Sequence, residues 1–224
     1  MSSAPVFDPR LVPVEGVDGH LPKVDRHELR PDALAARFAS PPVWRPEVVD
    51  EPIFSNRSPV HAAVLVALVL RERVTVLLTE RTQHLSSHSG QIAFPGGKTD
   101  PQDRDAIATA LREAHEEIGL DEGCVKVLGT LPIYTTGSAY RVTPVVALLA
   151  EGFKITPNAF EVADVFEVPL DFLMDPANHR RHAVQWAGAR REWLSIPYQD
   201  GATERFVWGA TAGMLRNLYR FLIA

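Results

Sequence analysis

The regular part of the chain begins with two apolar runs separated by a short polar stretch. The first run, VHAAVLVALVL at residues 60–70, is almost continuously apolar, and VTVLLTE follows at residues 74–80. A run of this kind is typical of a strand that is buried on both faces. The connecting residues RER are few and polar, so we expect a hairpin of two buried strands.

Further apolar segments predict the remaining elements. Those with strand patterns are GQIAFPGG (90–97), which ends in a glycine loop, VKVLGTLPIY (125–134), RVTPVVALLA (141–150) after the turn TTGSA, and the strand pair RHAVQWAGARREWLSIPY (181–198). VPLDFLMD (168–175) predicts a short helix, and WGATAGMLRNLYRFLIA (208–224) predicts a closing amphipathic helix. Strands, a central helix, more strands and a last helix together predict a mixed α+β sandwich.

Residues 1–57 differ from the rest of the chain in their proline content. Ten of the eighteen prolines lie before residue 60, which disfavours regular structure apart from a short helix near PDALAARF. Apolar anchors argue against free disorder: Leu11, Val14, Leu34, Phe38 and Trp44. We expect a proline-rich arm that packs on a single catalytic domain, residues 58–224, or on a partner subunit in a homodimer.

Composition narrows the class of protein. Hydrophobic residues make up 46% of the chain and the net charge is −5, so there is no general attraction for nucleic acid or anionic lipid. Cys124 is the single cysteine, which excludes an internal disulfide or a cysteine-built zinc site and fits a reducing compartment. The first residues lack a signal pattern, and the longest apolar run is too short to cross a bilayer. We expect a cytoplasmic protein without nucleic-acid or membrane partners.

A central helix is predicted between Asp100 and Gly119. Asp100 followed by Pro101 has the pattern of a helix start, and Asp103 would assist the cap. Gly119 is the expected end. An apolar stripe repeats between them at helical spacing: Ile107, Leu111, Ala114 and Ile118.

Three glutamates share another face of this helix. Glu113, Glu116 and Glu117 lie within five residues, and like charges at helical spacing repel each other by a few tenths of a kcal/mol per pair. Arg112 can reach Glu116 at i+4 and hold it in place. A solvated acidic face is the ordinary explanation of such a cluster. The alternative is a hard divalent cation such as Mg²⁺, which would neutralise the repulsion and take a further oxygen ligand from the backbone carbonyl near Gly97.

The segment REAHEEIGL, residues 112–120, resembles the Nudix box, G-x5-E-x7-R-E-U-x-E-E-x-G-U, in which U is aliphatic. Ala114 is small at an aliphatic position of this motif. The first half departs from the motif, since counting forward from Gly97 places Asp103 where a glutamate belongs, whereas counting back from Arg112 gives Arg104. One residue is therefore inserted, and aspartate replaces glutamate.

This departure and the sequence upstream resemble the coenzyme A pyrophosphatase branch of the family. LLTERTQHLSSHSGQIAFPGGKTDPQD, residues 77–103, is similar to the additional motif of that branch, with Thr82 where serine is usual. Downstream, YRVTPVVALL and VWGATAGMLRNL resemble it as well, so the resemblance spans residues 58–222. It implies a Nudix-type α/β/α sandwich with a mixed central sheet.

The resemblance implies metal-dependent hydrolysis of a diphosphate. Water attacks one phosphorus, while Mg²⁺ or Mn²⁺ neutralises the attacked anion, orients the nucleophile and stabilises the departing phosphate. The implied metal ligands are Glu113, Glu116, Glu117 and the carbonyl near Gly97, with Arg112 as an orienting residue. The general base would be a glutamate of this cluster or Glu161.

The implied substrate is coenzyme A or acyl-CoA, with 4′-phosphopantetheine and adenosine 3′,5′-bisphosphate as the products from coenzyme A. Four side chains are implied as donors to its phosphates: Arg81, His88, Lys98 and Arg141. Ordinary alternatives exist, because Arg81 could pair with Glu80 and His88 could be a hydrogen-bonded loop histidine. Other Nudix substrates, such as ADP-ribose, NADH or a dNTP, stay open. A non-catalytic Nudix-fold binding protein would be expected to lack a ligand glutamate, and all three are present.

Overall fold

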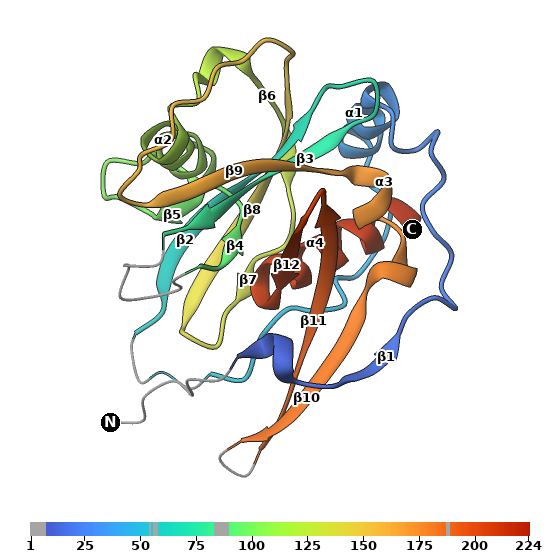
Figure 1. Ribbon diagram of the computed structural model, residues 1–224. Helices are drawn as coiled ribbons and strands as arrows, with labels where there is room; N and C mark the ends of the chain where they lie inside the picture. The colour runs from blue at the N-terminus through green and yellow to red at the C-terminus, as the bar shows by residue number, and fades with distance from the viewer. Residues whose placement is uncertain (1–7, 54, 56–57, 83–89, 187–188) are drawn as a thin grey trace.

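The computed structural model describes residues 8–53, 55, 58–82, 90–186 and 189–224, which form two β-sheets and four α-helices (Figure 1). The larger sheet contains β2 (Val60–Val69), β3 (Thr75–Arg81), β4 (Ile92–Ala93), β5 (Gly96–Lys98), β6 (Val125–Thr130), β7 (Tyr134–Thr135), β8 (Tyr140–Leu149) and β9 (Val162–Pro169). The smaller sheet contains β1 (Val14–Val17), β10 (Arg180–Trp186), β11 (Ala189–Asp200) and β12 (Thr203–Trp208). The helices are α1 (Pro31–Ala39), α2 (Ala106–Ile118), α3 (Leu170–Leu173) and α4 (Gly209–Ile223). The mixed α+β fold is confirmed.

The larger sheet is mixed and is built around β2. β2 pairs in parallel with β8 along its whole length, and antiparallel with β3 and β5 on its other edge. The predicted hairpin of β2 and β3 is confirmed by the pairing of Leu68 with Val76. The predicted glycine loop is itself a short strand, because Gly96 and Gly97 pair with Val64 and Ala63 of β2.

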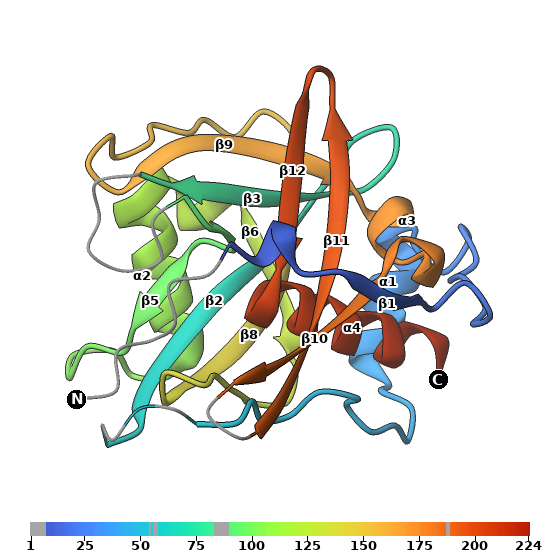
Figure 2. The same ribbon diagram turned by 60° about the horizontal axis from the view of Figure 1, so that its bottom comes forward.

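Both faces of this sheet are covered, which explains the nearly continuous apolar run of β2. α2 lies on one face, whereas α4 and the smaller sheet lie on the other (Figures 1 and 2). Alternate residues of β2 enter two separate cores. Ala63 and Leu65 pack with α2, and Val66 and Leu68 pack with α4.

α4 is enclosed more completely than its sequence suggests. The predicted closing helix is confirmed, but every residue from Thr211 to Tyr219 is buried, so its polar side does not face solvent as an amphipathic surface helix would. The polar residues on its inner side have partners inside the protein. Arg216 is 1% exposed and forms ion pairs with Asp18 and Glu47. Among the described residues, no helix is long and apolar enough to cross a membrane.

Three strands were not predicted from the sequence: β1, β9 and β12. β9 and β12 carry charged residues at positions that the fold neutralises. Arg205 of β12 pairs with Asp164 of β9, and Glu167 of β9 pairs with Arg71. Charged residues in a segment normally indicate that it faces solvent. Because the partners of these charges are distant in the sequence, β9 and β12 could not be recognised as strands from the sequence.

The N-terminal arm lies against the rest of the chain at several described points. β1 pairs with β10, and the side chain of Leu34 in α1 is fully buried. The ring of Trp44 contacts Phe221 at a centroid distance of 5.3 Å. These segments therefore enlarge the core on the α4 side of the sheet. The expectation that Leu11 and Val14 are packed anchors is wrong within this single chain, since they are 80% and 44% exposed.

α2 begins later than predicted. Asp105 is the N-cap, and its Oδ1 accepts the N–H of Ala108 at 2.8 Å. Asp100 does not cap the helix, because its own N–H donates to Asp103 Oδ2 at 2.8 Å in a turn that precedes it. The end is as predicted, since Gly119 has a φ of 66°, a left-handed conformation that favours glycine.

Candidate active site

The candidate site lies where α2 crosses β5. The glycines of β5 allow this close approach, because a Cβ on Gly97 would lie 2.4 Å from Glu113 Oε2. At Gly96 a Cβ would lie 2.4 Å from the carbonyl oxygen of Ala63 in β2. The carboxylate of Glu113 therefore packs directly on the glycine strand.

Arg112 is the central hydrogen-bond donor of the site. It donates to Glu113 at 3.0 Å and to Glu116 at 3.1 Å, which is the contact that the i+4 spacing predicts. A third bond runs to the carbonyl oxygen of Lys98 at 2.9 Å. Arg112 thus ties two glutamates of α2 to the glycine strand. Its hydrogen bonds to Asp103 and, to a smaller extent, to Glu113 and Glu116 raise the pKa of Arg112 further above the usual range.

Asp103 holds Arg112 from the opposite side. The Nε and Nη2 atoms of Arg112 donate to the two carboxylate oxygens of Asp103 at 3.0 and 2.9 Å, a bidentate arrangement. The hydroxyl of Thr109 also donates to Asp103 at 2.9 Å. The hydrogen bonds from Arg112 hold the pKa of this carboxyl well below its usual range. Asp103 was expected as a helix cap, and its pairing with Arg112 was not predicted, although its position in the motif was an available signal.

Glu117 is the most deeply buried acid of the cluster. It is 4% exposed, accepts the N–H of Gly96 at 3.1 Å, and lies 3.4 Å from Nη1 of Arg81. Burial raises the pKa of Glu117 to about 7, against the opposing effects of Gly96 and Arg81. The Nε atom of Arg81 is buried without a hydrogen-bond partner among the described residues, so this side chain retains a donor at the site.

Glu161 lies close to the same cluster. Its carboxylate helps to raise the pKa of both Glu113 and Glu117, although burial is the larger cause for each. The backbone around it is fixed, since its carbonyl oxygen accepts the N–H of Thr82 at 3.0 Å and its N–H donates to the carbonyl oxygen of Asn158 at 2.9 Å. The carboxylate of Glu161 therefore acts on the two buried glutamates of α2, Glu113 and Glu117.

The donor chemistry of the site fits a hard divalent cation. Carboxylate oxygens dominate it, and burial raises the pKa of Glu113 and Glu117 even though Arg112 and Arg81 lie beside them. Within the part of the chain that the structure describes, no three acidic, histidine or cysteine side chains converge closely enough to enclose a metal ion. Arg112 accounts for this arrangement, because it draws Glu113 and Glu116 to its guanidinium group. A cation would have to compete with Arg112 for these two oxygens.

The predicted phosphate donors are not all brought to this point. Arg81 faces Glu117 rather than its neighbour Glu80, which pairs instead with Arg205. The side chain of Lys98 is exposed, and Lys98 pairs with Ala62, which is on the α4 face of β2, so it alternates away from Gly97. Arg141, at the start of β8, is also exposed. His88 lies outside the described residues.

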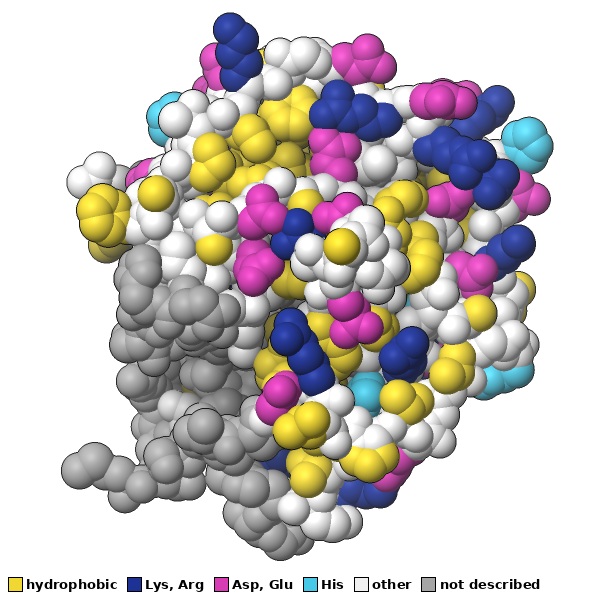
Figure 3. Space-filling model, in the orientation of Figure 1, with side chains coloured by type: hydrophobic (Ala, Val, Ile, Leu, Met, Phe, Trp, Pro, Cys, Tyr) yellow, Lys and Arg dark blue, Asp and Glu magenta, His cyan; other side chains and the backbone are white. Residues whose placement is uncertain are grey.

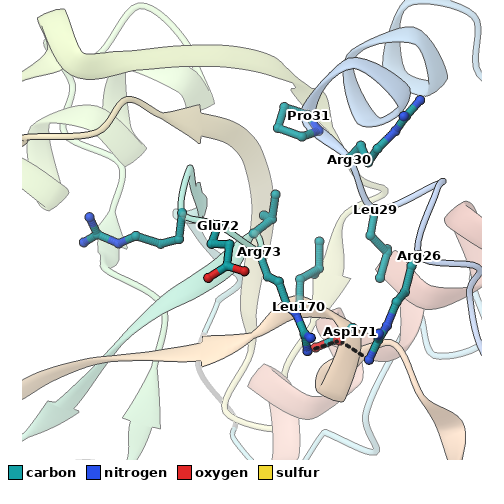
Figure 4. Close-up of a pocket in the computed structure, with 10 residues that line it drawn as sticks. Arg26, Leu29, Arg30, Pro31, Glu72, Arg73, Leu170 and Asp171 are labelled. Carbon is teal, nitrogen blue, oxygen red and sulfur yellow. Dashed lines mark ion pairs between the residues drawn. The ribbon is translucent and has the colours of Figure 1, made fainter.

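A separate hollow lies between α1, the β2–β3 turn and α3 (Figure 4). Arg26 and Arg73 point toward Asp171 there, at ion-pair distances of 3.3 and 3.6 Å, whereas Arg30 points away. Its cations are therefore already engaged or directed outward. Elsewhere on the face in Figure 3, acidic and basic side chains are interspersed without a large area of one sign. The cluster on α2 is the stronger candidate site.

Several known proteins are similar to this chain. The NUDIX domain family model matches residues 59–193. A protein named uncharacterized Nudix hydrolase NudL from Yersinia enterocolitica is 42% identical over 70% of this chain and 79% of its own length. The NudL protein of an Enterobacter strain is 39% identical over 87% of this chain and 96% of its own length. A solved Nudix hydrolase from M. smegmatis, RenU, has 26% identity and a TM-score of 0.41, covering 51% of this chain and 74% of that one.

Proposed function

Because this chain belongs to the Nudix hydrolase family, we propose that it hydrolyses the diphosphate bond of coenzyme A and its derivatives with the help of Mg²⁺ or Mn²⁺. Coenzyme A would give 4′-phosphopantetheine and adenosine 3′,5′-bisphosphate. The coarser statement, a Nudix hydrolase that acts on a nucleoside diphosphate derivative, follows from family membership. The substrate and the residue roles are the proposal.

The observation that carries the hydrolytic role is the packing of α2 on the glycine strand. It places Glu113 and Glu117 beside the backbone of Gly96 and Gly97, with Arg81 next to Glu117. The preference for coenzyme A rests on a different observation, the resemblance of residues 77–103 to the coenzyme A branch. These two supports are independent and can be tested separately.

We assign the metal to Glu113, Glu116, Glu117 and the carbonyl oxygen of Gly97. When bound, a divalent cation would neutralise the diphosphate and lower the energy of the charged transition state. Arg112 fixes the direction of Glu113 and Glu116, and Asp103 fixes Arg112. The protein thus positions its ligands through one guanidinium group.

Glu161 is the residue we propose as general base. It has no place in the Arg112 network, and its carboxylate lies close enough to influence both Glu113 and Glu117. A water oxygen forms the new bond to phosphorus, the bridging P–O bond breaks, and the departing phosphate ester takes the bond electrons. The proton of the water passes to the Glu161 carboxylate and then to solvent.

We assign Arg81 as a donor to the diphosphate, and the support for this is that its Nε atom is buried beside the cluster without a partner among the described residues. Lys98, Arg141 and His88 are the candidate donors to the outer phosphate groups. The 3′-phosphate of coenzyme A is the group that such donors would read.

The test is hydrolysis of coenzyme A, acyl-CoA, NADH, ADP-ribose and dATP with Mg²⁺, with products identified by mass. We expect coenzyme A to be the best substrate and dephospho-coenzyme A a poorer one. Equal rates for these two would remove the reading of the 3′-phosphate. Hydrolysis of another compound in the series would identify a different nucleoside diphosphate derivative, and binding without hydrolysis of any compound would indicate a non-catalytic protein.

A further inference from the structure

The turn that carries Glu161 also presents an aromatic ring to solvent. Phe160 is 79% exposed, although a phenyl ring is among the side chains most stabilised by burial. Exposed apolar residues are common on protein surfaces, so exposure alone does not indicate a function. What indicates a function for Phe160 is its position beside the site and the hydrogen bonds that hold its backbone.

The backbone beneath Phe160 is held from two sides. On the α2 side, the N–H of Asn158 donates to the carbonyl oxygen of Glu117 at 2.8 Å. On the β3 side, the hydroxyl of Thr82 donates to the carbonyl oxygen of Phe160 at 2.9 Å. The side chain of Asn158 also accepts the N–H of Phe160 at 3.1 Å. Both anchoring elements carry residues of the site, since Thr82 follows Arg81.

The backbone of Phe160 is therefore fixed at the rim of the carboxylate cluster. It directly precedes Glu161, in a turn that Asn158 ties to the backbone of Glu117. The start of β9, which follows this turn, lies beside the end of β3 (Figures 1 and 2). A substrate with its diphosphate at the cluster would extend past this ring at one of its two ends.

We propose that Phe160 is the stacking surface for the purine base of the substrate, and this inference rests on the proposed function. A rigid ring offers a planar heterocycle a full contact face, because every base has a π-face that can stack. A flexible pantetheine chain would gain less from the same ring, since it loses rotational freedom when it is held. Phe160 is thus assigned to the adenine end.

The test compares the two ends of coenzyme A in wild type, Phe160→Ala and Phe160→Trp. We expect Phe160→Ala to raise the KM for coenzyme A about tenfold and to leave kcat within about twofold, because stacking contributes to binding before and during reaction alike. As a competitive inhibitor, adenosine 3′,5′-bisphosphate should bind about tenfold more weakly to Phe160→Ala. The inhibition constant of 4′-phosphopantetheine should stay unchanged. Phe160→Trp should behave as wild type.

Val43→Ala is the matched control, because Val43 is fully exposed and its neighbour Trp44 contacts the C-terminal part of α4. It should change none of these constants. A weaker 4′-phosphopantetheine constant with an unchanged bisphosphate constant would overturn the assignment to the base, as would no change in either. If the wild type does not hydrolyse coenzyme A, the proposed substrate fails, and calorimetry with adenosine 3′,5′-bisphosphate then decides the inference: equal binding by wild type and Phe160→Ala, or none by either, overturns it.

Discussion

A methyl group added to Gly97 should separate catalysis from folding in this protein. A Cβ at this position would lie 2.4 Å from Oε2, 2.5 Å from Cδ and 2.7 Å from Oε1 of Glu113. Carbon atoms of this kind do not approach other heavy atoms closer than 3.0 Å, so the carboxylate must move by at least about 0.6 Å. Both of its oxygens are affected, which means that rotation of the carboxylate in place gives no relief.

The expected result for Gly97→Ala is a fall in kcat/KM of about 100-fold, since a displacement near 1 Å in an active site can cost about that much. The metal concentration needed for half-maximal activity should rise, because Glu113 is an assigned ligand. The fold should survive, since the displaced atoms are the end of a flexible side chain. We expect the free energy of unfolding to change by no more than about 1 kcal/mol.

Gly96→Ala is the contrasting variant. Its Cβ would lie 2.4 Å from the carbonyl oxygen of Ala63 and 2.6 Å from the Cα of Val64, which are backbone atoms of the buried strand β2. Gly96 also has a φ of 155°, which is unfavourable for alanine. This variant should lose stability in a thermal melt, whereas Gly97→Ala should not. If Gly97→Ala kept its kcat/KM within about threefold of wild type, the placement of Glu113 in the catalytic site would be wrong.

Three further predictions follow from the charge networks. Asp103→Asn should lower kcat/KM by about 10- to 100-fold, because Arg112 loses the carboxylate that orients it; an unchanged kcat/KM would contradict the positioning role. In metal-free protein the raised pKa of Glu117, about 7, means that the folded chain keeps a proton which the unfolded chain releases from about pH 4.5 upward. The contribution of Glu117 to stability should therefore be fully present below about pH 4.5 and fall by up to about 3 kcal/mol as the pH rises to 7, and this contribution, measured in chelator as the difference from Glu117→Gln, should be absent in that variant. Arg216→Met should cost about 3–5 kcal/mol in denaturant unfolding, because it leaves the buried carboxylate of Asp18 without this partner; a smaller loss than that of a surface arginine variant such as Arg104→Met would refute this reasoning.

The elements that could be predicted from the sequence are those whose apolar residues face two cores. β2 and β8 were found because covered faces leave few polar positions. β12 was missed because the charge of Arg205 is compensated by Asp164, which is distant in the sequence. The start of α2 was misplaced because Asp100 and Asp105 both precede residues compatible with a helix. Which of the two caps the helix depends on Asp103, because its carboxylate accepts hydrogen bonds from Arg112 and from the N–H of Asp100.

Within the site, only the contacts between residues of α2 that follow from helical spacing could be predicted from the sequence. The bond between Arg112 and Glu116 follows from the i+4 relation. The burial of Glu117 does not, because it arises from the approach of β5, and the N–H of Gly96 cannot be assigned to it from sequence. Arg81 shows the same limit, since adjacent strand residues point to opposite faces and Glu80 is therefore turned toward Arg205.

The contacts of the arm change the argument for a dimer. Apolar anchors in a segment without its own core require a surface to cover, which made a second subunit one of two candidates. The second half of the arm finds that surface within the same chain, because the carboxylate of Glu47 accepts from Arg216 at 2.7 Å and its N–H donates to the side chain of Asn217 at 2.9 Å. Both partners are buried residues of α4. Leu34, Phe38 and Trp44 therefore pack within the same chain, whereas Leu11 and Val14 are 80% and 44% exposed. These two anchors are left for a second subunit to cover, and the homodimer stays a prediction.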